Sequence, residues 1–267
     1  MRSFIQNYLA LFLHGAAVAS GGGQDDAKTP AEWVAMKLGF IPDAIQALVL
    51  NTPTKRGILN CTRQWGKSTV TAAKAVHKAY TEPGSLTLVV SPSGRQSGEM
   101  VRKAAEFTSR LGIKPKGDGH NEISLALPNG SRIIGLPATE ATVRGFSSVS
   151  MLLVDEAARV EDDLYMAMRP MLAVSGGTVW LISTPHGRRG FFWETWENGG
   201  RAWERVRVTA EECPRIPAEF LAEERVTIGE RRYLEEYGCE FTAPVDRLFD
   251  PADLEKAFSS DITPLNL

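Results

Sequence analysis

The chain has 267 residues, of which 43% are hydrophobic, enough to bury a real core and to exclude a disordered or collagen-like chain. Its 30 Lys and Arg residues nearly balance 32 Asp and Glu residues, so any contact with nucleic acid must come from a local patch. The three cysteines are widely spaced and the four histidines show no ligand spacing, which argues against a disulfide framework and a zinc site.

Residues 1–29 are predicted to form an N-terminal arm and a flexible joint. The apolar stretch from Tyr8 to Ala19 ends in small residues that resemble a signal-peptide cleavage site, but it is too short to span a membrane. Its apolar residues recur at roughly helical spacing, which favours an amphipathic arm, and a run of glycines follows it. Cleavage is therefore not expected.

Beyond this arm, strands and helices alternate along the chain. A helix is predicted to begin at Pro30 behind the cap residue Thr29, and a second covers residues 43–50. Further helices are predicted over 67–80 and 98–111, with two charged helices after Pro217. Strands are predicted over 57–61, 86–91, 122–127, 131–136, 151–154 and 178–182, with a hairpin turn at 128–130. This alternation indicates βαβ units and a mostly parallel sheet.

The segment from Cys61 to Thr69 has the pattern of a phosphate-binding loop, because it follows a predicted strand and opens a predicted helix. Backbone N–H groups at the helix start would cradle phosphates, with Lys67 between the β- and γ-phosphates and the Ser68 hydroxyl on Mg²⁺. Cys61 stands where the usual pattern has its first glycine. The predicted ATP-binding residues here are Cys61, Thr62, Arg63, Gln64, Trp65, Gly66, Lys67, Ser68 and Thr69.

The predicted strand over 151–154 ends in two carboxylates, Asp155 and Glu156. A carboxylate at this end of a parallel strand points into the crevice where nucleotides bind in open α/β sheets. Asp155 would therefore hold Mg²⁺, and Glu156 would polarise the water that attacks the γ-phosphate. The simpler interpretation is that both are exposed acids at the start of the next helix. Following a phosphate loop in this order, the pair predicts an ATP hydrolase.

Together these motifs resemble the ATPase domain of the large terminase subunit of tailed bacteriophages, the motor that packages DNA into proheads. The matching segments are residues 63–68, 154–158, 183–185 and, upstream, 40–46. The resemblance implies an α/β fold of the P-loop NTPase type with the ASCE arrangement. Its mostly parallel central sheet is flanked by helices and followed by a small C-terminal helical lid.

The resemblance also implies roles for single residues. Gln46 would read the adenine edge, and Arg63 would contact the γ-phosphate from within the loop. Arg144, shortly before the acidic strand, would supply an arginine finger to a neighbouring subunit. The implied catalytic residues are thus Glu156, Arg144 and Arg63. The segment implied to couple hydrolysis to movement consists of Ser183, Thr184 and Pro185.

The implied cofactors are ATP and Mg²⁺. The implied partners are double-stranded DNA, a portal protein, the small terminase subunit and further copies of this chain, in a ring on the prohead that is expected to be a pentamer. The expected location is the host cytoplasm, with no membrane contact. Candidate contacts to DNA phosphates are Arg188, Arg189, Arg201, Arg205 and Arg207.

The expected domains are an ATPase core over 30–210, the lid over 211–245 and a linker over 246–267. That linker would lead to a nuclease domain that we expect to be absent from this chain, so no nuclease activity is expected. Three other interpretations remain open: a helicase-like ATPase, a non-catalytic scaffold or portal-binding module of the same fold, and a secreted binding protein. Intact Lys67, Ser68, Asp155 and Glu156 argue against the scaffold.

Overall fold

The computed structural model of the chain describes residues 27–139 and 145–243, and in these the centre is a seven-stranded sheet with the order β3-β4-β2-β5-β6-β1-β7. Every neighbouring pair is parallel except β3 and β4, which form the predicted hairpin at one edge. The strands are β1 (Arg56–Cys61), β2 (Leu86–Ser91), β3 (Ser124–Ala126), β4 (Arg132–Pro137), β5 (Met151–Asp155), β6 (Thr178–Ser183) and β7 (Glu204–Val208).

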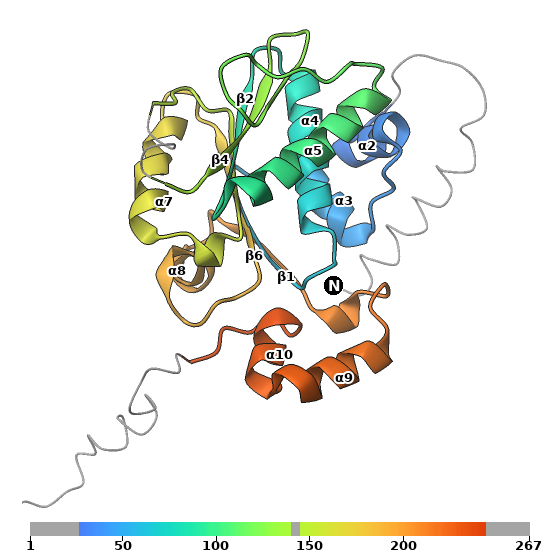
Figure 1. The fold of residues 1–267 in the computed structure, drawn as a ribbon, viewed down its shortest axis with the longest axis vertical. Helices are drawn as coiled ribbons and strands as arrows, with labels where there is room; N and C mark the ends of the chain where they lie inside the picture. Colours follow the sequence, from blue (N-terminus) through green and yellow to red (C-terminus); the bar gives the residue numbers. More distant parts are fainter. Residues whose placement is uncertain (1–26, 140–144, 244–267) are drawn as a thin grey trace, which may run out of the picture.

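Helices cover both faces of the sheet, so the core has three layers (Figure 1). One face carries α2 (Pro30–Leu38), α3 (Ala44–Asn51), α4 (Lys67–Thr81) and α5 (Gly94–Arg110), and the other carries α7 (Asp162–Met168) and α8 (Gly190–Asn198). Successive strand residues point to opposite faces. Leu153 accordingly joins the apolar cluster under the first set of helices, whereas Leu152 joins the cluster under the second. The predicted fold class is confirmed.

Local sequence signals explain where the first helices begin. The Thr29 side chain accepts a hydrogen bond from the N–H of Glu32, and Pro30 occupies the first turn of α2, as predicted. Asp43 caps α3 through a capping box in which the Gln46 side chain accepts the Asp43 N–H. In α5 the cap is Ser93, so the helix starts four residues before the predicted position at 98.

The sequence patterns do not predict strand β7. Its residues alternate between charged side chains and the buried Val206 and Val208, and it pairs with β1 at the edge of the sheet. An edge strand this short, with one face exposed, lacks the continuous apolar run that marks the central strands.

Two further helices, α9 (Ala218–Ile228) and α10 (Glu230–Glu236), lie beside the carboxyl ends of the strands (Figure 1). We call them the helical pair. They pack around a small apolar cluster that contains Leu221 and Tyr233. The helices themselves agree with the predicted charged helices, and the lid boundaries at 211 and 245 stay a prediction. No helix in the described part of the chain is both long and apolar enough to cross a bilayer.

Gly57 in β1 lies against Trp180 on the neighbouring strand β6. A Cβ at position 57 would lie 2.3 Å from the fully buried Trp180 ring, so a larger side chain fits there only if the ring shifts. We expect Gly57→Ala to lower the free energy of unfolding by about 3 kcal/mol, measured by urea denaturation, because the core must be overpacked. The control is Gly94→Ala at the start of α5, where the nearest atom is 3.7 Å away. Equal urea midpoints for the two variants would contradict this account.

Candidate nucleotide site

The segment between β1 and α4 forms a compact loop that ends at the helix start. Gly66 is the N-cap of α4 with φ of 99°, a conformation that favours glycine, and Gln64 adopts φ of 64°. An α-helix leaves its first N–H groups without carbonyl partners along the helix, and these point out of its N-terminus. The loop and the start of α4 therefore have the geometry of an anion site, in agreement with the predicted phosphate loop.

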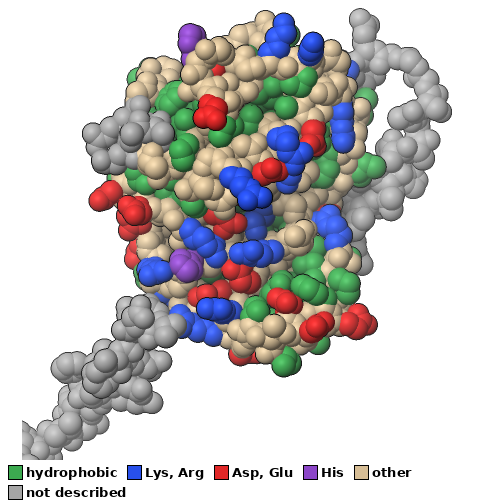
Figure 2. Space-filling view, in the orientation of Figure 1, with side chains coloured by type: hydrophobic (Ala, Val, Ile, Leu, Met, Phe, Trp, Pro, Cys, Tyr) green, Lys and Arg blue, Asp and Glu red, His purple; other side chains and the backbone are tan. Residues whose placement is uncertain are grey.

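A pocket of about 470 Å³ opens next to the loop. Cations dominate its charged lining, with Glu156 as the acid among them. The lining residues are Phe40, Gln46, Arg63, Gln64, Gly66, Lys67, Ser68, Thr69, Lys103, Glu156 and Arg215. Figure 2 shows Lys and Arg side chains gathered on this face where the core meets the helical pair. A larger hollow of about 750 Å³ is lined by residues such as Lys55 and Gly176, and contains none of the loop residues.

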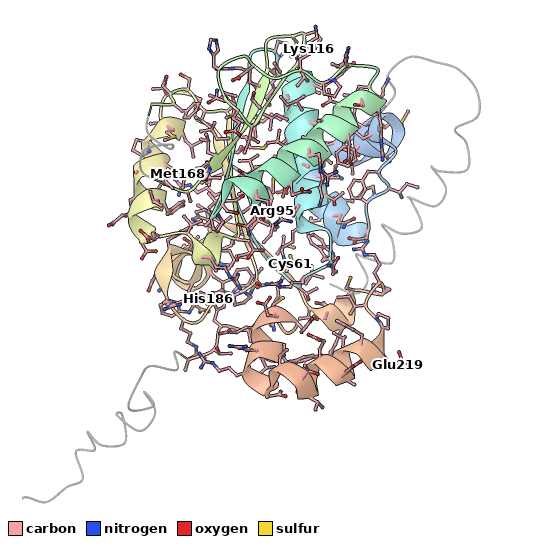
Figure 3. The ribbon with its side chains drawn as sticks, viewed as in Figure 1. Cys61, Arg95, Lys116, Met168, His186 and Glu219 are labelled. Atoms are coloured by element: carbon pink, nitrogen blue, oxygen red, sulfur yellow. The ribbon has the colours of Figure 1, made fainter. Side chains whose placement is uncertain are left out.

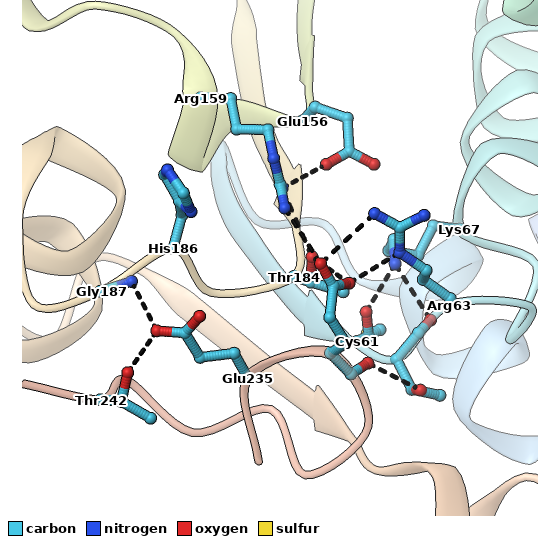
Figure 4. Close-up of polar contacts among 12 residues, drawn as sticks. Cys61, Arg63, Lys67, Glu156, Arg159, Thr184, His186, Gly187, Glu235 and Thr242 are labelled. Atoms are coloured by element: carbon cyan, nitrogen blue, oxygen red, sulfur yellow. Dashed lines mark hydrogen bonds and ion pairs between the residues drawn. The ribbon is translucent and has the colours of Figure 1, made fainter. Parts of the chain in front are cut away.

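Lys67, the first residue of α4, is buried beneath the loop. Figure 3 shows Cys61, the last residue of β1, at the end of the core that faces the helical pair. The Nζ of Lys67 donates to the carbonyl oxygens of Cys61 at 2.6 Å and Thr62 at 3.0 Å (Figure 4). Burial lowers the pKa of Lys67, because desolvation penalises the charged form. An anion brought into the loop would offset that penalty, so the ammonium is suited to a phosphate ligand.

The acidic strand end lies beside this pocket. Asp155 is the last residue of β5 and is buried, and its burial and then the adjacent Glu156 carboxylate raise its pKa to about 6. Glu156 follows with φ of 49°, an uncommon conformation for a residue with a side chain. Its side chain lines the pocket, where a residue that acts on the nucleotide has to lie.

The donor set fits a magnesium ion held jointly with phosphates. Within the described residues, no group of three or more His, Cys, Asp or Glu side chains could hold a metal alone. Mg²⁺ commonly takes one or two protein oxygens plus phosphate oxygens and waters. The buried Asp155 carboxylate and the Ser68 hydroxyl, from β5 and α4, offer two such oxygens, and a cation would relieve the raised pKa of Asp155.

Four charged side chains of alternating sign connect the loop, the acidic strand end and the helical pair (Figure 4). Arg63 Nε donates to Glu236 at 2.7 Å, and Arg159 donates to Glu236 at 3.1 Å and to Glu156 at 2.8 Å. Burial opposes the charge on Glu236, but the bond from Arg63 and the attraction of both arginines lower its pKa overall. Glu236 therefore stays ionised between the two guanidinium groups.

Sequence reasoning missed Arg159 and Glu236, and with them the pocket residues Lys103 and Arg215. The spacing of Glu156 and Arg159 was visible as a local ion pair. Nothing local marks Glu236, which meets Arg63 across 173 positions of sequence. Arg63 itself was predicted to contact the γ-phosphate, and in this structure it lies on Glu236 instead.

Gln46 lies in the pocket wall, with its side chain already used by the protein. Its amide oxygen accepts the Asp43 N–H at 3.0 Å, and its amide nitrogen donates to the Trp65 carbonyl at 3.0 Å. The amide thus ties α3 to the phosphate loop. One N–H and one lone pair of the amide remain, and the adenine contact stays a prediction.

The predicted coupling segment lies at the carboxyl end of β6. The Ser183 hydroxyl is buried and has no hydrogen-bond partner among the described residues. Thr184 Oγ1 donates to Glu236 at 3.2 Å, and so joins the charged network. Pro185 follows shortly after the strand, so the strand ends there. A role in coupling stays a prediction.

Two other arginines singled out from the sequence contribute nothing to the pocket lining. Arg144, the candidate finger, falls outside the described residues. Arg205 donates to backbone carbonyls around the end of α8, including that of Trp196 at 2.6 Å, so it stabilises the fold instead of presenting a free guanidinium.

The remaining candidates for DNA contact differ in how far their side chains are occupied. Arg188 and Arg207 both donate to backbone carbonyls. Arg189 contacts the His186 ring at 2.9 Å, and Arg201 is exposed. Their contact with DNA stays a prediction.

Comparison with known proteins identifies the family. The model of the family "Terminase large subunit, T4likevirus-type, N-terminal" matches residues 58–256, more than half of the chain. The chain belongs to this terminase family. The terminase resemblance stated from the sequence is confirmed.

Individual relatives agree with this assignment. The terminase large subunit of Thermus virus P23-45 is 24% identical, over 81% of this chain and 52% of its own length. The large terminase ATPase domain of Thermus phage P74-26 superposes with a TM-score of 0.71 at 22% identity, covering 81% of this chain and all of that one.

A third structure, the large terminase of a thermophilic bacteriophage in complex with ADP, has a TM-score of 0.61 at 10% identity, covering 71% of this chain and 49% of that one. The similarity of these structures is evidence for the fold. The chain spans about half the length of the viral relative matched by sequence.

Proposed function

We propose that this chain is the ATP hydrolase part of a viral DNA-packaging motor. The observation that carries the proposal is that Lys67, Ser68 and Glu156, from the two ends of the phosphate site, line one pocket. Membership of the terminase family supports the role in packaging, and a phage large terminase of the same fold has been solved in complex with ADP.

In the proposed mechanism, the N–H groups at the start of α4 and the Lys67 ammonium bind the β- and γ-phosphates of ATP. Asp155 and Ser68 would hold Mg²⁺, which supplies charge neutralisation on the phosphate oxygens when bound. Glu156 accepts a proton from the attacking water. The buried Ser183 hydroxyl, which has no partner in the described protein, is proposed to hold that water from the adjoining strand end.

The proposed partners are double-stranded DNA, portal protein, small terminase subunit and other copies of this chain in a ring, with five copies expected, in the host cytoplasm. The proposed chemistry is ATP hydrolysis without nuclease activity. The helical pair is proposed to be the lid. This motor role is tested by DNA packaging: with cognate proheads and the remaining motor parts, ATP should render added DNA resistant to DNase, and DNA that stays digestible would contradict it.

A helicase-like ATPase is the second candidate, favoured by the same phosphate loop and Asp-Glu strand end. A helicase should hydrolyse ATP in response to nucleic acid and separate strands, whereas a packaging motor moves the intact duplex. Separation of a fluorescent duplex by the purified chain would favour the helicase.

Lys67→Ala should abolish ATP binding, because the phosphates lose the buried ammonium at the base of the loop. The measurement is titration with a fluorescent ATP analogue and Mg²⁺, together with phosphate release. Lys78→Ala is the matched control, since Lys78 lies on the same helix in an ion pair with Glu82, away from the pocket. Binding of wild-type strength in Lys67→Ala, with the fold intact by circular dichroism, would refute the site.

A further inference from the structure

We propose that Glu236 of the helical pair is a latch that holds Arg63 until ATP arrives and then releases it to the phosphates. In this role Glu236 is a positioning residue, and it acts on the nucleotide through Arg63 and on Glu156 through Arg159. The proposal rests on the proposed function, since it assumes that ATP binds in the pocket beside Lys67.

The contact between Arg63 and Glu236 uses both oxygens of the carboxylate. Arg63 Nε donates to Oε2 at 2.7 Å and a terminal nitrogen donates to Oε1 at 3.3 Å. Arg63 also lines two pockets at once, the nucleotide pocket and an adjoining pocket of about 390 Å³ that contains Glu236. The guanidinium is therefore placed between its present partner and the phosphate site.

The same carboxylate holds the residue that restrains Glu156. Glu236 Oε1 accepts a bond from Arg159 at 3.1 Å, and another nitrogen of Arg159 donates to Glu156 at 2.8 Å. Arg159 is thus shared between two carboxylates, one on the helical pair and one at the acidic strand end (Figure 4). A change in the charge around Glu236 therefore changes the balance of that sharing.

ATP would change that balance by competing for Arg63. The Arg63 side chain is 55% exposed, and an ion pair this exposed is weak, whereas phosphate in a partly closed pocket binds a guanidinium strongly. Once Arg63 moves to the phosphates, Glu236 keeps Arg159 as its charged partner and attracts it more strongly. Arg159 then releases Glu156 for the attacking water.

Contacts other than the Glu236 side chain attach the helical pair to the core. Glu235 accepts the Gly187 N–H at 3.1 Å, and Asn60 donates to the Cys239 carbonyl at 2.9 Å. Thr62 donates to the backbone carbonyl of Glu236 at 3.1 Å, a bond that any residue at this position would keep. The Glu236 carboxylate is therefore not required to hold the helices in place, and its pairing with two arginines has another use.

The neighbouring glutamate provides a matched control. Glu235 lies on the same helix and contacts the core through Gly187 and Thr242, whereas Arg63 and Arg159 both pair with Glu236. Glu236→Gln removes the charge and keeps the size of the side chain, and Glu235→Gln does the same one position earlier. If the carboxylates only attached the helices, both variants should lower the melting temperature and neither should tighten nucleotide binding.

The test compares binding of ATPγS with Mg²⁺ by calorimetry in both variants of the full chain. Glu236→Gln should bind about two- to fivefold more tightly than wild type, since Arg63 no longer leaves an ion pair, and Glu235→Gln should bind as wild type. The kcat of Glu236→Gln should fall, because Arg159 stays on Glu156. Tighter binding with slower turnover is the signature of the latch, and Glu236→Asp should restore part of the turnover.

A second background makes the mechanism specific. In Arg63→Gln, the further change Glu236→Gln should leave ATPγS affinity unaltered, because the residue to be released is missing. Unchanged or weaker binding by Glu236→Gln alone, or equal tightening in the Arg63→Gln background, would overturn the latch while the proposed function stands. Absence of any ATPγS binding by the wild-type chain would overturn both.

Discussion

Glu156→Gln should bind ATP with nearly wild-type affinity and hydrolyse it about 10²- to 10⁴-fold more slowly, the range over which a general base contributes. Glutamine preserves the size of the side chain and its place in the pocket wall, but cannot accept the proton of the attacking water. The loss should therefore appear in kcat and leave the dissociation constant for ATPγS nearly unchanged.

Glu161→Gln is the control for this variant. Glu161 is an exposed acid at the start of α7 and makes no capping hydrogen bond with its side chain, so its loss should affect neither constant. Single-turnover hydrolysis with Mg-ATP measures the chemical step directly. Wild-type turnover in Glu156→Gln would mean that another group activates the water.

The phosphate loop could be predicted because its elements follow one another in sequence: a buried strand, a short loop with Gly66 and a helix that begins with Lys67. The same holds for the caps of α2 and α3, where Thr29 and Asp43 bond to residues three positions on or fewer. Signals of this kind are local, so one sequence is enough to see them.

The charged network could not be predicted, because it depends on how the helical pair meets the core. Glu236 is one of many acids on two charged helices, and nothing in its neighbourhood distinguishes it from Glu235. Folding brings Glu236 into contact with Arg63 and Arg159. The backbone partners of Arg205 and Arg207 could not be predicted for the same reason, since those carbonyls lie on other elements or loops.

Arg144→Ala should remove most of the ATPase activity that depends on assembly. The residue lies outside the described residues, and its proposed role comes from the terminase resemblance, in which an arginine acts on the nucleotide of a neighbouring subunit. Such arginines contribute on the order of 10³–10⁵ in rate. Wild-type specific activity should rise with protein concentration as subunits meet, and Arg144→Ala should lose this rise while its affinity for ATP stays nearly intact. Arg201→Ala, at another exposed arginine, should behave as wild type.

Mixing two inactive variants distinguishes action between subunits from action within one. Arg144→Ala subunits keep their own phosphate loop and Glu156, whereas Glu156→Gln subunits keep Arg144. Where a Glu156→Gln subunit presents Arg144 to the site of an Arg144→Ala subunit, one interface is complete, so the mixture should regain activity that neither variant has alone. If the two variants co-assemble, as seen by light scattering, and no activity returns, Arg144 does not act between subunits. Arg63 would then be the better candidate for contacting the γ-phosphate, since it lines the pocket of its own chain and its ion pair with Glu236 is exposed enough to exchange.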